Sequence, residues 1–84
     1  MSDLTDNEIA ARNLDAERVR RRKTVGDIAN ALSVSESMVY GILKGDIEIS
    51  ITMVSKIAPI FDMSVYQLMM LLLQPIDSIK QVKA

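Results

Sequence analysis

The chain has 84 residues, of which 49% are hydrophobic and 25% charged, with three glycines and two prolines. This composition predicts a single compact domain over residues 1–84 and argues against a disordered or collagen-like chain. The formal net charge of −1 excludes a polycationic tail protein, and the absence of cysteine and histidine excludes disulfides, Cys/His zinc sites and imidazole bases.

Other protein classes are also disfavoured by the sequence. No secretory signal is visible, and the longest apolar run is far shorter than a membrane span, so we expect a cytoplasmic protein without membrane contact. No nucleotide-binding loop, metal-ligand cluster or catalytic constellation is recognisable. We therefore expect a protein that is not an enzyme and that needs no metal or cofactor.

The first predicted helix has a strong charge gradient. Thr5 or Asp6 is its candidate N-cap, and it is expected to run to about Arg22. Residues 1–17 carry five acidic side chains and one basic one, whereas residues 18–23 hold five of the ten basic side chains of the chain. Acids near the N-terminus and bases near the C-terminus are favoured by the helix dipole.

Two short helices follow. Thr24 is the expected N-cap of a helix over residues 25–32, whose apolar side chains recur with helical spacing. After a break, Ser35 is the expected N-cap of a helix over residues 36–44, with Gly45 just past its end. The apolar stripe of this third helix is expected to belong to the core and consists of Met38, Val39, Ile42 and Leu43.

The rest of the chain also carries helix signals. A fourth helix is expected to begin after Ser50 or Thr52, and Pro59 is expected to kink it or end it early because proline is unfavourable in a helix interior. Two further helices are predicted, over residues 65–74 after Ser64 and over residues 76–83 after Pro75.

Residues 68–73 are six apolar residues in succession, and they surround a helix on all sides. One face of such a helix must contact something other than a small core. Two interpretations are open: pairing with a second copy, or burial within a monomer capped by the last helix. The residues predicted to form the dimer contact are Leu68, Met69, Leu72, Leu73, Ile76, Ile79 and Val82.

Residues 24–45 contain two short helices joined by a tight turn, with a capped polar start to the second, which is the pattern of a helix-turn-helix. The segment resembles the Cro/C1-type repressor domain of phage and bacterial regulators. The resemblance covers about residues 9–70 and continues through Ile57-Ala58 with Phe61 and through Ser64-Val65-Tyr66-Gln67-Leu68. It implies an all-α, four- or five-helix repressor-type bundle over residues 9–70, with an apolar dimerising extension over residues 71–84.

The resemblance also implies a function, namely a sequence-specific DNA-binding transcriptional regulator that acts as a homodimer, with repression as the expected mode. Helix 36–44 would then be the recognition helix in the major groove. Its base-facing positions would be Glu36, Ser37, Tyr40 and Gly41, and the phosphate-facing corner would comprise Arg20, Arg21, Arg22, Lys23 and Thr24. Ser35 and Lys44, at the two ends of the recognition helix, complete the predicted DNA-contacting set.

Alternative interpretations of these residues remain open. The basic run 18–23 also fits a solvated helix end, Glu36 also fits a helix-start acid that favours the dipole, and Tyr40 also fits the edge of the core. The rival function is an interaction module, an antirepressor or co-regulator, that keeps the repressor fold but binds another regulatory protein. Glu36, Val25, Asp46 and the net acidity favour this rival, whereas the basic run Arg20–Lys23 and Tyr40 favour DNA. A helix-1 Arg of the family pairs with a Glu where this chain has Leu43, so Arg18 is expected to reach solvent or Asp15.

Overall fold

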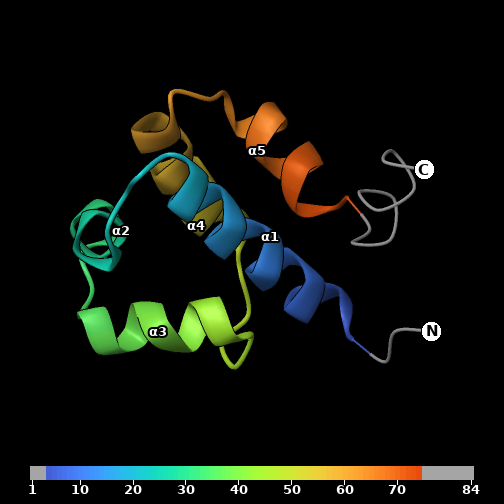
Figure 1. Cartoon of the computed structure of the whole chain (residues 1–84), viewed down its shortest axis with the longest axis horizontal. Coiled ribbons are helices and arrows are strands. Elements are labelled where there is room, and N and C mark those ends of the chain that lie inside the picture. The colour runs from blue at the N-terminus through green and yellow to red at the C-terminus, as the bar shows by residue number, and fades with distance from the viewer. Residues whose placement is uncertain (1–3, 75–84) are drawn as a thin grey trace.

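The framework of the protein consists of helices joined by short connections. The computed structural model describes residues 4–74, which contain no strand. The elements are α1 (Asp6–Arg20), α2 (Val25–Leu32), α3 (Glu36–Lys44), α4 (Ile51–Ile57), the 3-10 helix η1 (Ala58–Phe61) and α5 (Val65–Leu72) (Figure 1). The prediction of an all-α bundle is confirmed.

Each of the five α-helices begins at a Ser or Thr whose hydroxyl accepts a hydrogen bond from a backbone N–H of the first turn. These N-caps are Thr5, Thr24, Ser35, Ser50 and Ser64. Where the sequence left two candidates open, the structure uses Thr5 rather than Asp6 and Ser50 rather than Thr52. The local capping chemistry therefore fixes where each helix starts.

The helix ends differ slightly from the predicted ones. Helix α1 stops at Arg20, two residues early, because the chain turns through Arg22 in a left-handed conformation with φ 59°. Helix α4 ends at Ile57 and continues as η1, with Pro59 near its start, as expected for a residue without a backbone N–H. Helix α5 stops at Leu72 instead of Gln74. The helix predicted over residues 76–83 lies outside the described residues.

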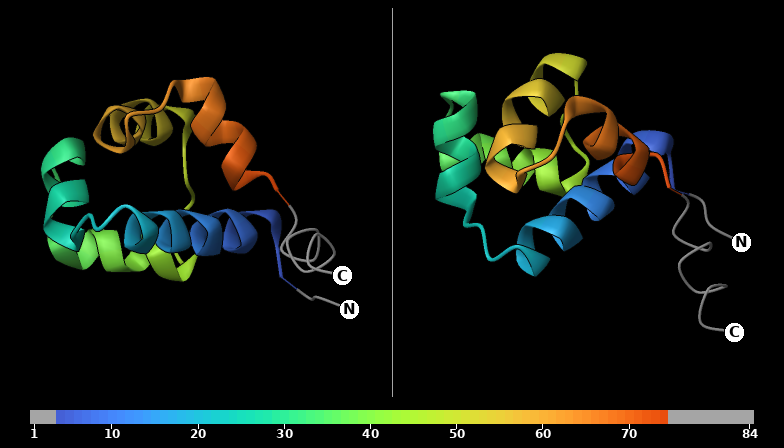
Figure 2. Two further views of the ribbon diagram at one scale, coloured as in Figure 1. Left: turned by 45° about the horizontal axis from the view of Figure 1, so that its top comes forward. Right: turned by 90° about the horizontal axis from the view of Figure 1, so that it is seen from above.

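Helix α1 lies in the middle of the structure. It packs against α3 on one side and α5 on the other, while α2 and α4 close the remaining side (Figures 1 and 2). The core between them is apolar. Its largest fully buried side chains are Phe61, Leu14, Ile28, Ile42, Ile57, Leu68 and Val39.

Helix α5 belongs to this core. Leu71 and Leu72 continue the helix, and Leu72 is buried, so the boundary expected between residues 70 and 71 falls inside an element. Within residues 4–74, no helix has the length and hydrophobicity that crossing a bilayer would require.

Candidate nucleic-acid interface

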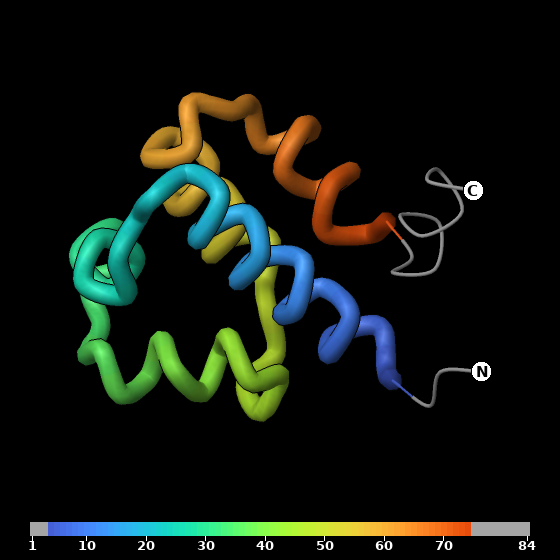
Figure 3. The backbone as a smooth tube through the Cα atoms, in the orientation of Figure 1, coloured from blue at the N-terminus to red at the C-terminus, as the bar shows by residue number. Residues whose placement is uncertain are grey.

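The predicted helix-turn-helix is formed by α2, a short turn and α3, and Figure 3 traces its path. Ser33 ends α2 in a left-handed conformation with φ 58° and ψ 45°. Ser35 then caps α3, its hydroxyl accepting from the Met38 N–H at 3.2 Å. Val39 and Ile42 are fully buried and determine which face of α3 points inward. The opposite face of α3 is therefore open to solvent.

The open face of α3 carries four of the residues predicted to contact DNA, Glu36, Ser37, Tyr40 and Lys44. The side chain of Tyr40 is held away from the core and is 52% exposed. The side chains of Ser37, Tyr40 and Lys44 make no hydrogen bond or ion pair with residues 4–74, so they are free to meet a ligand. By contrast, the Ser35 hydroxyl is already engaged as the N-cap of α3.

Gly41 lies at the edge of this open face, next to the loop that follows α3. A Cβ atom at Gly41 would come within 2.9 Å of Ile47 Cδ1, so the loop after α3 covers this position. Gly41 itself is partly exposed, but Ile47 packs beside it and leaves no room for a side chain at this position. The open face consequently consists of side chains from the start, middle and end of α3, without Gly41.

Two carboxylates lie at the start of α2. A Cβ atom at Gly26 would be 3.2 Å from Glu36 Oε2, so the Glu36 side chain reaches across from α3 to the first turn of α2. The Thr24 backbone N–H donates to Asp27 Oδ2 at 2.8 Å and lowers the pKa of Asp27 below its ordinary value. Thr24 is also committed through its hydroxyl, which accepts from the Asp27 N–H. The start of α2 therefore holds two carboxylates, and the charge of the neighbouring Lys23 also lowers the pKa of Asp27.

The basic residues at the end of α1 divide into two groups, and the larger group is held by the protein. Arg18 Nε donates to Asp15 Oδ1 at 2.9 Å, as the sequence predicted, and its Nη1 donates to the Lys23 carbonyl at 2.9 Å. Its side chain is only 20% exposed. Arg18 therefore fastens the end of α1 to the connection that leads to α2.

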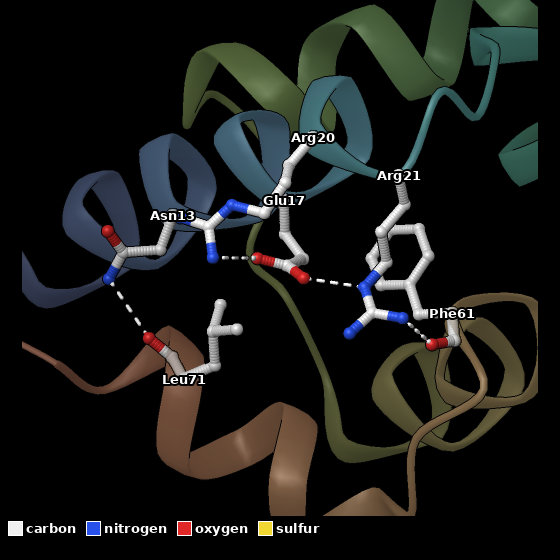
Figure 4. Close-up of polar contacts among 6 residues, drawn as sticks. All are labelled: Asn13, Glu17, Arg20, Arg21, Phe61 and Leu71. Atoms are coloured by element: carbon white, nitrogen blue, oxygen red, sulfur yellow. Dashed lines mark hydrogen bonds and ion pairs between the residues drawn. The ribbon is translucent and has the colours of Figure 1, made fainter.

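Arg20 and Arg21 share the carboxylate of Glu17, whose side chain is 3% exposed (Figure 4). Arg21 Nε lies 2.5 Å from Glu17 Oε2, and its guanidinium also donates to the carbonyl of Phe61. Arg20 Nη1 lies 3.5 Å from Glu17 Oε1, with a side chain that remains 74% exposed. Arg21 thus ties α1 to η1, whereas Arg20 stays accessible from solvent.

Arg22 and Lys23 form the second group. Neither makes an ion pair with residues 4–74, and the left-handed turn at Arg22 places its side chain in solvent. Both lie in the connection directly before the N-cap of α2, beside the α2–α3 unit. With Lys44 at the end of α3, they are the basic residues on or directly before the α2–α3 unit that make no ion pair with residues 4–74.

The residues predicted to form the dimer contact fall into three groups: buried, at least partly exposed, and outside the described residues. Leu68 and Leu72 are buried in the core of the chain itself, which corrects the expectation that they are open to a second copy. Met69 is half-buried, and Leu73 is 67% exposed. Ile76, Ile79 and Val82 lie outside the described residues.

Sequence reasoning missed three polar residues that organise the fold around these surfaces. The Asn13 amide donates to the carbonyls of Leu71, Leu72 and Gln74 at 3.3, 3.0 and 2.8 Å. The Asn7 amide donates to the carbonyls of Gly45 and Ile47, and its Oδ1 accepts from the Ile49 N–H. The third, Glu17, precedes Arg20 and Arg21 by three and four residues, a helical spacing that signals ion pairs. No local signal marks the two asparagines.

Comparisons with known proteins identify a family. The model of the BetR domain matches residues 2–77, which is most of the chain. No curated protein and no solved structure shows a significant match.

Proposed function

The chain belongs to the BetR domain family, small helical domains associated with helix-turn-helix regulators, and from this we propose that it binds duplex DNA as a transcriptional regulator. The observation that carries the proposal is the solvent-open face of α3 in an α2–turn–α3 unit flanked by Arg22 and Lys23. We further propose that it acts as a homodimer and as a repressor, in the manner of the Cro/C1-type regulators that its sequence resembles.

The proposed docking follows from the shape of the unit. Helix α3 would enter the major groove, which is wide enough for one α-helix, with Ser37 and Tyr40 toward the base edges. Arg22, Lys23 and the exposed Arg20 would face the phosphates that border the groove. Two copies related by a two-fold axis would place their α3 helices in successive major grooves about 34 Å apart. No enzymatic activity and no cofactor belong to this proposal.

The proposed phosphate contacts of Arg22 and Lys23 can be tested by removing the two charges. Replacing Arg22 and Lys23 together with Ala should weaken binding to all duplex sequences and flatten the slope of log K against log salt by about 0.9 per lost phosphate contact. Fluorescence anisotropy on labelled duplexes from a binding-site selection measures both quantities. Lys56→Ala is the matched control, because Lys56 is an exposed cation on α4, outside the α2–α3 unit.

Two results would contradict the proposal. One is absence of duplex binding by the parent protein at about 50 mM salt, where electrostatic binding is strong. The other is an equal loss of affinity in the control and in the double variant, which would mean that Arg22 and Lys23 occupy no special position.

A second candidate function is supported by the acids around α3. Glu36 and Asp27 lie at the start of α2, and Asp46 and Glu48 are exposed just after α3. Negative charges beside a phosphate backbone oppose DNA binding. An interaction module that binds another regulatory protein is therefore the alternative. A parent protein that is folded but does not bind duplex DNA at low salt would favour it.

A further inference from the structure

The connection between α1 and α2 turns at an arginine in a conformation that arginine seldom adopts. Arg22 has φ 59°, in the left-handed region where glycine is the usual residue at a helix end. The Arg22 N–H donates to the Val19 carbonyl and the Lys23 N–H to the Arg18 carbonyl, both at 3.0 Å, which is the Schellman arrangement for ending a helix. We call residues 21–23 the α1–α2 corner.

Arg18 binds the backbone of this corner at two points. Its carbonyl accepts from the Lys23 N–H, and its guanidinium Nη1 donates to the Lys23 carbonyl at 2.9 Å. Its Nε donates to Asp15 Oδ1 at 2.9 Å, and the Arg18 side chain is only 20% exposed. The guanidinium is therefore held on α1 by Asp15 while it holds the far side of the corner.

The residue after the corner is fixed as well. The Thr24 N–H donates to Asp27 Oδ2 at 2.8 Å, and the Thr24 hydroxyl accepts from the Asp27 N–H at 3.0 Å. The corner is thus bound to α1 on one side and joined to a capped helix start on the other. The backbone that carries Arg22 and Lys23 consequently has a defined orientation relative to the α2–α3 unit.

We propose that Arg18 is a positioning residue for DNA binding, which holds the corner so that the side chains of Arg22 and Lys23 face the phosphates beside α3. The inference rests on the proposed function and deepens it by assigning the residue that orients the phosphate-facing cations. Arg18 itself touches no phosphate in this arrangement, because its Nε and Nη1 already donate to the protein. Cations on an ordered backbone lose less conformational entropy on binding than cations on a mobile one.

The left-handed conformation of Arg22 supports a role for the cation at this position. A side chain with a Cβ atom is less stable than glycine in this region, so a helix end that served the fold alone would favour glycine. Unfavourable backbone conformations persist where the surroundings enforce them, and they are common at functional sites. Here the contacts of Arg18 enforce the conformation, and Arg22 supplies the exposed charge.

A double-mutant cycle on duplex DNA tests the positioning role. Arg18→Met removes the guanidinium and keeps an unbranched apolar side chain. We expect it to lower affinity about 5-fold in the parent, and less than about 2-fold in a protein whose Arg22 and Lys23 are already Ala, because no cation is then left to orient. Fluorescence anisotropy at several salt concentrations measures each affinity.

The salt dependence separates positioning from a loss of stability. In the parent background, Arg18→Met should flatten the slope of log K against log salt by up to about 0.9 for each phosphate contact that is lost. In the background without Arg22 and Lys23 the slope should not change. Arg12→Met is the matched control, because it removes an exposed cation from α1 that makes no ion pair with residues 4–74. Its effect should be small and equal in both backgrounds, and circular dichroism would show that all variants are folded.

Two further measurements examine the corner directly. Hydrogen exchange of the Arg22 and Lys23 amides should accelerate in Arg18→Met, whereas exchange at Leu14, in the middle of α1, should not. Arg22→Gly should raise the midpoint of urea unfolding and yet weaken duplex binding, because glycine suits the turn but lacks the cation.

The outcomes distinguish this inference from the proposed function. An equal loss of affinity from Arg18→Met in both backgrounds would overturn the positioning role, since the effect would then come from stability or from direct contact with DNA. Unchanged exchange of the Lys23 amide, or full affinity in Arg22→Gly, would overturn it too. All three results leave duplex binding intact. A parent that binds no duplex DNA would contradict the proposed function and this role together.

Discussion

Glu17 is a buried acid that organises the basic end of α1. Its carboxylate is almost inaccessible and lies against two arginines, one of which also donates to the Phe61 carbonyl (Figure 4). A buried carboxylate needs such partners because desolvation of an unpaired charge is costly. The pairing removes Arg21 from the set of freely available cations and gives it a structural role.

This arrangement predicts that Glu17→Gln destabilises the protein by about 2 kcal/mol, because a charge-assisted hydrogen bond and its ion pair are lost in a nearly buried site. Asp15→Asn is the control. It removes the partner of Arg18 at a carboxylate that is 45% exposed, where the loss should stay below about 1 kcal/mol. Urea unfolding followed by circular dichroism gives both values. Equal losses would mean that burial of Glu17 does not strengthen its interactions.

At the scale of elements, the helix starts follow the sequence preferences for N-caps, and the end of α2 departs from the preference for glycine at a positive φ. Five Ser or Thr caps lie where the sequence favours them. Ser33, however, ends α2 with a positive φ that non-glycine residues adopt at a cost. The family that the sequence resembles often has glycine in this turn.

Ser33→Gly should therefore stabilise the protein by about 0.5–1 kcal/mol, since glycine adopts this conformation without a Cβ clash. Ser35→Gly provides the comparison, because Ser35 has φ −75° and a capping hydroxyl. That change is expected to give no gain and to cost a few tenths of a kcal/mol. Thermal and urea unfolding measure the difference. A loss of stability in Ser33→Gly would show that the Ser33 side chain has a role of its own.

The start of α2 predicts a pH dependence. The Thr24 N–H holds the pKa of Asp27 below its ordinary value, so the ionised carboxylate stabilises the folded state above about pH 4. That contribution is lost as the pH falls through the lowered pKa of the folded protein. The stability difference between the parent and Asp27→Asn should consequently be largest near pH 7 and shrink toward pH 2. Urea unfolding over this range measures it.

Asp46→Asn is the matched control for the pH series, because it makes the same charge change at an exposed aspartate that accepts no side-chain hydrogen bond from residues 4–74. Its difference from the parent should stay nearly constant over the range. A shrinking difference in both variants would assign the effect to net charge instead of the cap.

At the scale of the whole molecule, long-range polar contacts hold α5 in place. Asn13 is separated from its acceptors Leu71, Leu72 and Gln74 by about sixty residues of sequence. The last carbonyls of a helix have no partners within the helix, and here a side chain of α1 supplies them. The contact joins the first and last described helices.

We expect Asn13→Ala to lower the free energy of unfolding by about 1–3 kcal/mol, because buried carbonyls lose their donor. Asn30→Ala, at an exposed position of α2, should change it by less than about 0.5 kcal/mol. Urea unfolding compares the two, and hydrogen exchange of the α5 amides should accelerate only in Asn13→Ala. Unchanged α5 exchange would contradict a role in holding α5.

Features that depend on neighbouring residues could be predicted from the sequence, whereas features that depend on distant contacts could not. Caps, helix bounds and the inward stripe of α3 depend on neighbouring residues, so they were predictable. The division of residues 68–73 into buried and exposed faces depends on how α5 packs. The sequence indicated only that one face of this helix would not be needed for the core. The roles of Asn7 and Asn13 depend on contacts across the chain, which no local pattern encodes. The crowding of Gly41 by Ile47 was not predictable for the same reason, since Ile47 folds back from the following loop.

The isolation of three α3 side chains has a consequence for how this domain evolves. Ser37, Tyr40 and Lys44 contribute neither to the core nor to any cap or ion pair of residues 4–74. Exposed substitutions of this kind usually change stability by less than about 0.5 kcal/mol. Selection can therefore explore these positions almost without a stability penalty, whereas Gly41 between them is constrained by Ile47. Under the proposed function, new recognition preferences can therefore arise by substitution at three sites on an unchanged scaffold.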